Sequence, residues 1–181
     1  MPIIKIEKGK NYDWGLWKIE ETVDDLLKDL KLTDIEKKRV SVLQNINRKK
    51  QNITARLLLN HLAKKKVELN YSDAGVPFCG DFNYISISHS NNYCMVATSD
   101  EKIGIDIQYF KEGIQKLSLK YMNTQEILYA NNNIMKLHFI WSAKEAIYKT
   151  LNGAECSFKE DIYIENVKKN KITNGYYLRN K

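Results

Sequence analysis

The sequence predicts an α+β fold, and three observations indicate it. Leucine-rich segments at helical spacing occupy much of the chain before residue 66. Alternating polar and apolar residues follow, and a second strongly helical pattern lies near residues 138–151. The 181 residues, 43% hydrophobic, suffice for one compact domain or two small halves sharing a core. With only 2 prolines and 8 glycines, the composition excludes a disordered or fibrous chain.

The first third of the chain is predicted to be helical. Thr22–Leu30 has apolar residues at helical spacing. Thr33 and Glu36 have the spacing of a capping box, so a second helix is predicted to begin there and to run through Ile46. After a basic cluster, a third, leucine-rich helix is predicted over Asn52–Lys65.

The middle of the chain predicts an antiparallel meander. Asn83–His89 alternates between polar and apolar residues, and Tyr93–Thr98 reads as the returning strand. Asn91-Asn92 between them can take the positive φ values of a tight hairpin. Ile103–Tyr109 is predicted to be the third strand.

The last third predicts three helices and two strands. The helices are expected over Ile114–Tyr121, Thr124–Ala130 and His138–Leu151. Asp161–Val167 alternates as a strand, and Tyr176–Leu178 is a candidate for another.

The net charge of +7 favours anionic partners, although solubility alone explains it equally well. The basic segments lack interleaved aromatic residues, so no nucleic-acid partner is predicted. No apolar segment approaches the roughly 20 residues that span a bilayer, which predicts no membrane partner. The three cysteines show no CxxC spacing, so reduced thiols and a cytoplasmic location are expected.

Two polar patterns could hold a cation. On a strand over 103–109, Asp106 and Gln108 would share a face with Gly104, and their oxygens suit Mg²⁺. A solvated strand face is the alternative. On the helix at 138–151, Glu145 and Lys149 are neighbours at i and i+4. They are either an ordinary surface pair, or a metal carboxylate and a phosphate cation.

Two further patterns could hold phosphate. Ser88 and His89 lie where a strand enters a tight turn, and such polar groups suit an anion, although the pattern alone favours an ordinary polar hairpin end. No nucleophile-elbow pattern surrounds them, which argues against a Ser/His/Asp hydrolase. A basic set is either a solvated helix face or a phosphate clamp. It comprises Arg48, Lys49, Lys50 and Arg56, with Lys64, Lys65 and Lys66 further along the chain.

The order of these segments resembles the surfactin-synthetase-activating type of 4'-phosphopantetheinyl transferase. The resemblance rests on Gly-Val-Pro-Phe at 75–78, Ile-Ser-Ile-Ser-His-Ser at 85–90, Gly-Ile-Asp at 104–106 and Trp-Ser-Ala-Lys-Glu-Ala-Ile-Tyr-Lys at 141–149. It covers roughly residues 36–153. It implies two similar α/β halves whose antiparallel sheets face each other, expected here at 1–102 and 103–181 with a short C-terminal half.

By this resemblance, the protein would transfer the phosphopantetheine arm of coenzyme A to a serine of an acidic apo carrier protein, with Mg²⁺ or Mn²⁺. The first half would hold the phosphates of coenzyme A, and the second the metal site and the catalytic helix. Asp106, Gln108 and Glu145 would bind the metal, and Glu145 and Lys149 would be catalytic. The coenzyme A contacts would be Arg48, Lys49, Arg56, Gly75, Pro77, Ser88, His89 and Lys149.

The sequence also departs from this family. Gln108 stands where glutamate is usual, which removes one negative charge from the metal site. Val76 stands where lysine is frequent. These departures and the short C-terminal half keep an alternative open: an inactive protein of the same fold that binds coenzyme A or a carrier protein. We favour a monomer over a dimer.

Overall fold

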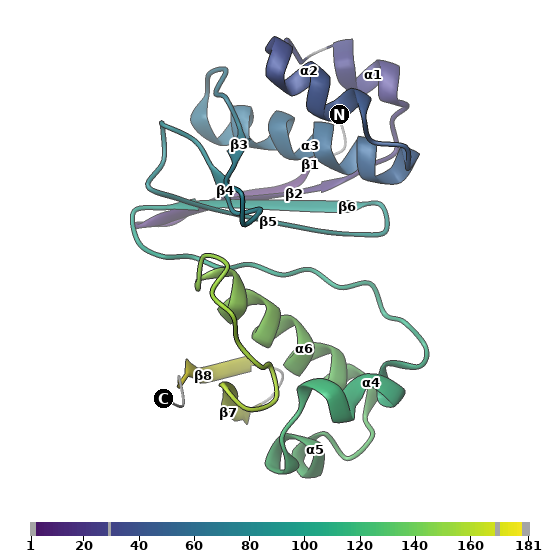
Figure 1. Cartoon of the computed structure of the whole chain (residues 1–181), viewed down its shortest axis with the longest axis vertical. Coiled ribbons are helices and arrows are strands. Elements are labelled where there is room, and N and C mark those ends of the chain that lie inside the picture. The colour runs from purple at the N-terminus through teal and green to yellow at the C-terminus, as the bar shows by residue number, and fades with distance from the viewer. Residues whose placement is uncertain (1–2, 29, 169–170, 179–181) are drawn as a thin grey trace. The chain divides into compact units, whose positions relative to one another are not determined.

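The computed structural model describes residues 3–28, 30–168 and 171–178. The chain forms two compact units, Met1–Ile107 and Gln108–Lys181, coloured purple to teal and teal to yellow in Figure 1. These units divide at residues 107 and 108, and the sequence analysis expected two halves that divide at 102 and 103. Backbone N–H groups of Ile105 and Ile107 donate to side chains of the first unit, which is why this segment belongs to it.

A four-stranded antiparallel sheet forms the base of the first unit (Figure 1). Its order is β1-β2-β6-β5, and the strands are β1 (Ile3–Lys8), β2 (Tyr12–Lys18), β5 (Tyr84–Ser90) and β6 (Tyr93–Ser99). A separate short hairpin joins β3 (Asn70–Tyr71) to β4 (Pro77–Phe78).

The hairpin predicted in the middle of the chain is confirmed. Ser90 pairs with Tyr93 across a two-residue turn, and Asn91 has a φ of 53°. The third strand predicted over Ile103–Tyr109 is wrong, because these residues form neither strand nor helix. The place beside β6 is taken by β2, whose hairpin with β1 the sequence analysis did not assign.

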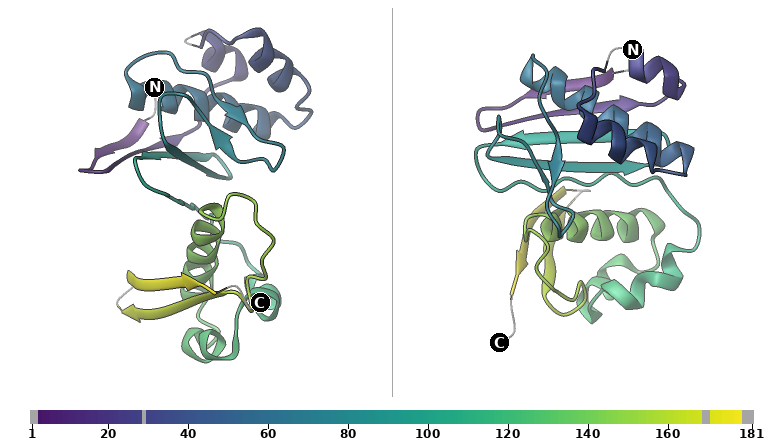
Figure 2. Two further views of the ribbon diagram at one scale, coloured as in Figure 1. Left: turned by 60° about the vertical axis from the view of Figure 1, so that its left-hand side comes forward. Right: turned by 45° about the horizontal axis from the view of Figure 1, so that its top comes forward.

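One helix, α3 (Ile46–Ala63), packs on a face of this sheet, and two further helices, α1 (Val23–Lys28) and α2 (Asp34–Ser41), pack on α3 (Figure 2). The predicted capping box at Thr33 and Glu36 is confirmed. The predicted helix through Ile46 is divided, because α2 ends at Ser41 and the Asn45 side chain caps a new helix by accepting from Arg48 N–H at 3.0 Å.

The core of the first unit lies between α3 and the sheet. Trp17 on β2, Leu58 on α3 and Cys94 on β6 are each fully buried. A Cβ at Gly15 would lie 2.8 Å from Leu58 Cδ2, so a larger residue at 15 would push α3 away from β2. This packing holds the beginning of α3 against the hairpin of β5 and β6.

The second unit contains three helices and one hairpin. The helices are α4 (Ile114–Tyr121), α5 (Thr124–Ala130) and α6 (Ile134–Lys149), and the hairpin joins β7 (Ile162–Lys168) to β8 (Lys171–Tyr177). All three predicted helices are confirmed, although α6 begins four residues earlier than predicted because Asn133 caps it. Both predicted strands are present, and β8 is longer than expected.

A second core forms where α6 packs on α4, α5 and the hairpin. Met122, Ile140 and Ile162 are buried in it. The hairpin approaches α6 closely, since a Cβ at Gly175 would lie 2.7 Å from Ile147 Cδ1. The α+β class is thus confirmed, whereas the predicted similarity of two facing halves stays a prediction. In the part of the chain described, every helix is too short or too polar to cross a bilayer.

Candidate functional site

Asp106 lies on an extended segment attached to β5 by serine hydroxyls. Ile105 N–H donates to Ser86 Oγ at 3.0 Å, and Ile107 N–H donates to Ser88 Oγ at 3.2 Å. Since side-chain oxygens accept these bonds, the segment follows β5 without forming a strand ladder with it. This is the physical reason that the alternating pattern did not become a third strand.

Ser88 also fixes the carboxylate of Asp106. Its hydroxyl donates to Asp106 Oδ1 at 2.8 Å while its oxygen accepts from Ile107 N–H. A hydroxyl has one proton, and that proton is used on Asp106. The structure therefore makes Ser88 a residue that orients Asp106, and its contact with a phosphate of coenzyme A stays a prediction.

The beginning of α3 is tied to the turn that follows His89. Gln51 Nε2 donates to the Asn91 carbonyl at 2.7 Å. Arg48 and Lys49 lie in the first turn of the same helix. The structure thus brings the predicted basic residues and the His89 end of β5 to one side of the first unit. A helix N-terminus adds partial positive charge there, which suits an anion.

Arg56 does not lie on this surface. It is 1% exposed, and its Nε donates to Glu36 Oε1 at 3.1 Å. Its Nη1 donates to Asn52 Oδ1 at 2.5 Å. The expectation that Arg56 holds a phosphate of coenzyme A is therefore corrected: the guanidinium is buried between α2 and α3 in an ion pair with Glu36.

Gly75 and Pro77 lie on the β3–β4 hairpin. Gly75 has a φ of 77°, a conformation that other residues rarely adopt, and its N–H donates to the Ser72 carbonyl at 2.9 Å. Pro77 is opposite Tyr71, and β4 packs against β5. The turn explains the Gly-x-Pro pattern locally. Contact of these residues with an adenine stays a prediction.

Glu145 and Lys149 lie on α6, one turn apart as predicted. The residue directly before this glutamate, Lys144, has a structural role that sequence reasoning missed. Lys144 is fully buried, and its ammonium lies 2.8 Å from Glu126 Oε2 and 2.6 Å from the Phe158 carbonyl.

The ion pair of Lys144 joins three elements of the second unit. Lys144 also donates to the Ile162 carbonyl at 2.6 Å, and Glu126 Oε1 accepts from Ile164 N–H at 3.0 Å. Burial lowers the pKa of Lys144, and Glu126 opposes that shift. The pair fixes α6 against α5 and β7, and thereby fixes the rotation of α6 that carries Glu145. The sequence contained one signal of this structural role: a charged residue, Lys144, stands among the apolar, partly buried residues of α6.

The predicted metal residues are divided between the two units. Asp106 belongs to the first, while Gln108 and Glu145 belong to the second. Among the residues that the structure describes, no group of three His, Cys, Asp or Glu side chains could hold a metal ion. The predicted set contains two carboxylates and an amide, which is a donor chemistry that Mg²⁺ accepts when phosphate and water complete its shell.

No protein-family model matches this chain, and no curated protein matches it either.

Proposed function

We propose that this protein transfers the 4'-phosphopantetheine arm of coenzyme A to a serine hydroxyl of an acidic apo carrier protein. The observation that carries the proposal is the hydrogen bond from Ser88 to Asp106. Ser88 lies on the hairpin whose turn is bonded to the beginning of α3, where Arg48 and Lys49 lie. An oriented carboxylate, with two cations at a helix N-terminus tied to the same hairpin, suits a ligand that combines metal and phosphate.

In this proposal, the first unit binds the phosphates of coenzyme A. Arg48 and Lys49 hold its 3'-phosphate, and His89 contacts its pyrophosphate. Ser88 acts through Asp106, since its only proton is engaged there. Gly75 and Pro77 form the turn that would lie beside the adenine.

The second unit supplies the groups that act on the reacting atoms. Glu145 accepts the proton of the carrier serine as the hydroxyl oxygen forms a bond to the β-phosphorus. The bond between the β-phosphorus and the bridging oxygen breaks, and adenosine 3',5'-bisphosphate leaves with that oxygen and the electron pair. Lys149 offsets the negative charge that develops on the leaving phosphate. No nucleophile of the protein itself is required.

Asp106, Gln108 and Glu145 are the residues that would hold Mg²⁺ or Mn²⁺. The metal would neutralise charge on the pyrophosphate. Because Gln108 replaces a carboxylate with a neutral amide, weaker metal binding is expected than with three carboxylates. The net charge of +7 favours association with an acidic carrier.

A second function is an inactive protein that binds coenzyme A or a carrier, and the neutral Gln108 is the feature that favours it. One experiment separates the two. The protein is incubated with coenzyme A, Mg²⁺ and apo carriers of the fatty-acid, polyketide and peptide classes, and each carrier is weighed by mass spectrometry. Coenzyme A binding is measured in parallel by calorimetry.

A gain in carrier mass of one phosphopantetheine arm, lost without the metal, would support transfer. Coenzyme A binding without any gain in mass would support the inactive protein. If neither binding nor transfer occurs, both functions are wrong.

A further inference from the structure

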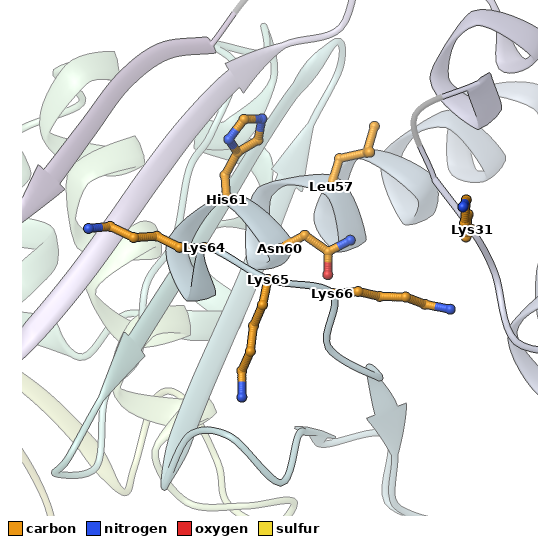
Figure 3. Close-up of a pocket in the computed structure, with 7 residues that line it drawn as sticks. All are labelled: Lys31, Leu57, Asn60, His61, Lys64, Lys65 and Lys66. Atoms are coloured by element: carbon orange, nitrogen blue, oxygen red, sulfur yellow. The ribbon is translucent and has the colours of Figure 1, made fainter.

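The first unit contains a basic pocket where α3 ends, and nothing in the proposed transfer uses it. Its volume is about 600 Å³, within the usual range for small-ligand sites. Its lining comes from the segment after α1, the last turns of α3 and the residues that follow them (Figure 3). The lining residues are Lys31, Leu57, Asn60, His61, Lys64, Lys65 and Lys66.

The polar groups that line this basic pocket are almost entirely hydrogen-bond donors. Of the seven described lining residues, four are lysines and none carries a carboxylate. Asn60 Oδ1 already accepts from Val67 N–H at 2.9 Å. In Figure 3 the amide nitrogen of Asn60 points to the side on which Lys31 and Lys66 lie. A site that offers donors and positive charge selects an anion.

The positions of the lysines indicate how large that anion is. Lys66 extends to the side of the end of α3 on which Lys31 lies, while Lys64 extends to the opposite side (Figure 3). Lys65 is directed elsewhere, because it forms an ion pair with Asp81. A pocket of about 600 Å³ lined by four lysines has room and positive charge for more than one phosphate group.

This pocket is separate from the predicted coenzyme A contacts. Arg48 and Lys49 lie in the first turn of α3, and the pocket lies at its last turn. A helix of 18 residues is about 27 Å long, so the pocket is well separated from Arg48 and Lys49, and its positive charge comes from its lysines. The inference therefore does not rest on the proposed transfer.

We propose that the pocket at the end of α3 binds a small polyanion carrying two or more phosphate groups. Lys31 and Lys66 neutralise one end of it, and Asn60 Nδ2 donates a hydrogen bond to that end. Lys64 neutralises the other end. The buried Leu57 side chain is the apolar part of the wall.

The test uses tripolyphosphate as the probe, with orthophosphate as its single-phosphate counterpart. Binding to the full chain is measured by calorimetry at low ionic strength in buffer without divalent metal. The pocket variant is Lys31→Gln with Lys66→Gln. The matched control is Lys116→Gln with Lys120→Gln, which removes two exposed lysines from α4 and changes the net charge equally. Circular dichroism checks that each variant folds.

We expect tripolyphosphate to bind the wild type and the control with equal affinity. Binding to the pocket variant should be about fivefold weaker, because that variant loses two solvent-exposed charge contacts. Orthophosphate should bind much more weakly than tripolyphosphate. A third variant, Arg48→Gln with Lys49→Gln, should retain tripolyphosphate binding even if it loses coenzyme A.

Three results would overturn the proposal. One is absence of binding to the wild type, and another is equal weakening in the pocket variant and the α4 control. The third is tighter binding of a short DNA duplex than of tripolyphosphate, which would identify the surface as a nucleic-acid interface. Since no readout depends on arm transfer, failure of the transferase assay leaves this test intact.

Discussion

Replacing Lys144 by methionine should unfold the second unit selectively. Methionine has a similar length but cannot donate, so the change removes the ammonium and its contacts to Glu126 and the two carbonyl groups of Phe158 and Ile162. Glu126, which is 3% exposed, would keep its charge without its ion-pair partner. Breaking a buried pair in this way costs about 3–5 kcal/mol.

That loss is comparable to the whole stability of a unit of this size. The second unit spans residues 108–181, and small domains are stabilised by about 0.05–0.15 kcal/mol per residue. Hydrogen exchange followed by mass spectrometry resolves the two units in the intact chain. Amides of α6 and β7 should lose most of their protection, while those of β5 and β6 retain theirs.

Two further variants make this prediction specific. Lys159→Met removes an exposed charge from the same unit and should leave exchange unchanged. Adding Glu126→Gln to the Lys144 variant removes the stranded carboxylate and should recover part of the protection. If the Lys144 variant loses less than about 0.5 kcal/mol, as surface substitutions do, then the pair does not hold α6 in place and the reasoning fails.

Three other predictions concern the first unit. Ser88→Ala should raise the Mg²⁺ concentration needed for half-maximal transfer, because it removes the hydrogen bond to Asp106. Ser86→Ala removes a similar backbone contact but none to Asp106, so it should leave that concentration unchanged. Equal effects of the two variants would contradict the positioning role of Ser88. The ammonium and hydroxyl that hydrogen-bond to Asp25 hold its pKa at about 2, below the ordinary 3.8. Its stabilising contribution is therefore present above the ordinary pKa and lost as the pH falls through about 2, and an NMR titration with a midpoint near 3.8 would contradict this. Burial raises the pKa of Cys94 to about 12, so alkylation of this thiol should require unfolding; rapid labelling of the native protein would count against it.

Local signals in the sequence predicted most of the elements correctly. The capping box at Thr33 marks where α2 begins, and Asn91 marks the turn of the β5–β6 hairpin. Such signals act through contacts between residues close in sequence, so they can be recognised without the fold. The same holds for Glu145 and Lys149, which lie one helical turn apart.

The predictions that were wrong depend on contacts between residues far apart in the sequence, and local patterns do not reveal such contacts. The pattern at 103–109 alternates like a strand, but its donors are taken by Ser86 and Ser88 in place of a strand partner. Arg56 resembles a phosphate ligand until Glu36, which is 20 residues away, is found to neutralise it in the core. The structural role of Lys144 also depends on long-range contacts, because its partners lie on α5 and β7, and the sequence alone does not reveal these contacts.

The central claim is tested most directly by the mass of an apo carrier protein after incubation with coenzyme A, Mg²⁺ and one of three forms of this chain. The forms are the wild type, Glu145→Gln and the exposed control Glu160→Gln. If the protein is the proposed transferase, the wild type and the control should add one phosphopantetheine arm to the carrier at equal rates. Glu145→Gln should be slower by about 10²–10⁴-fold, as loss of a general base implies. An unmodified carrier with the wild type, or equal rates for all three forms, would contradict the claim.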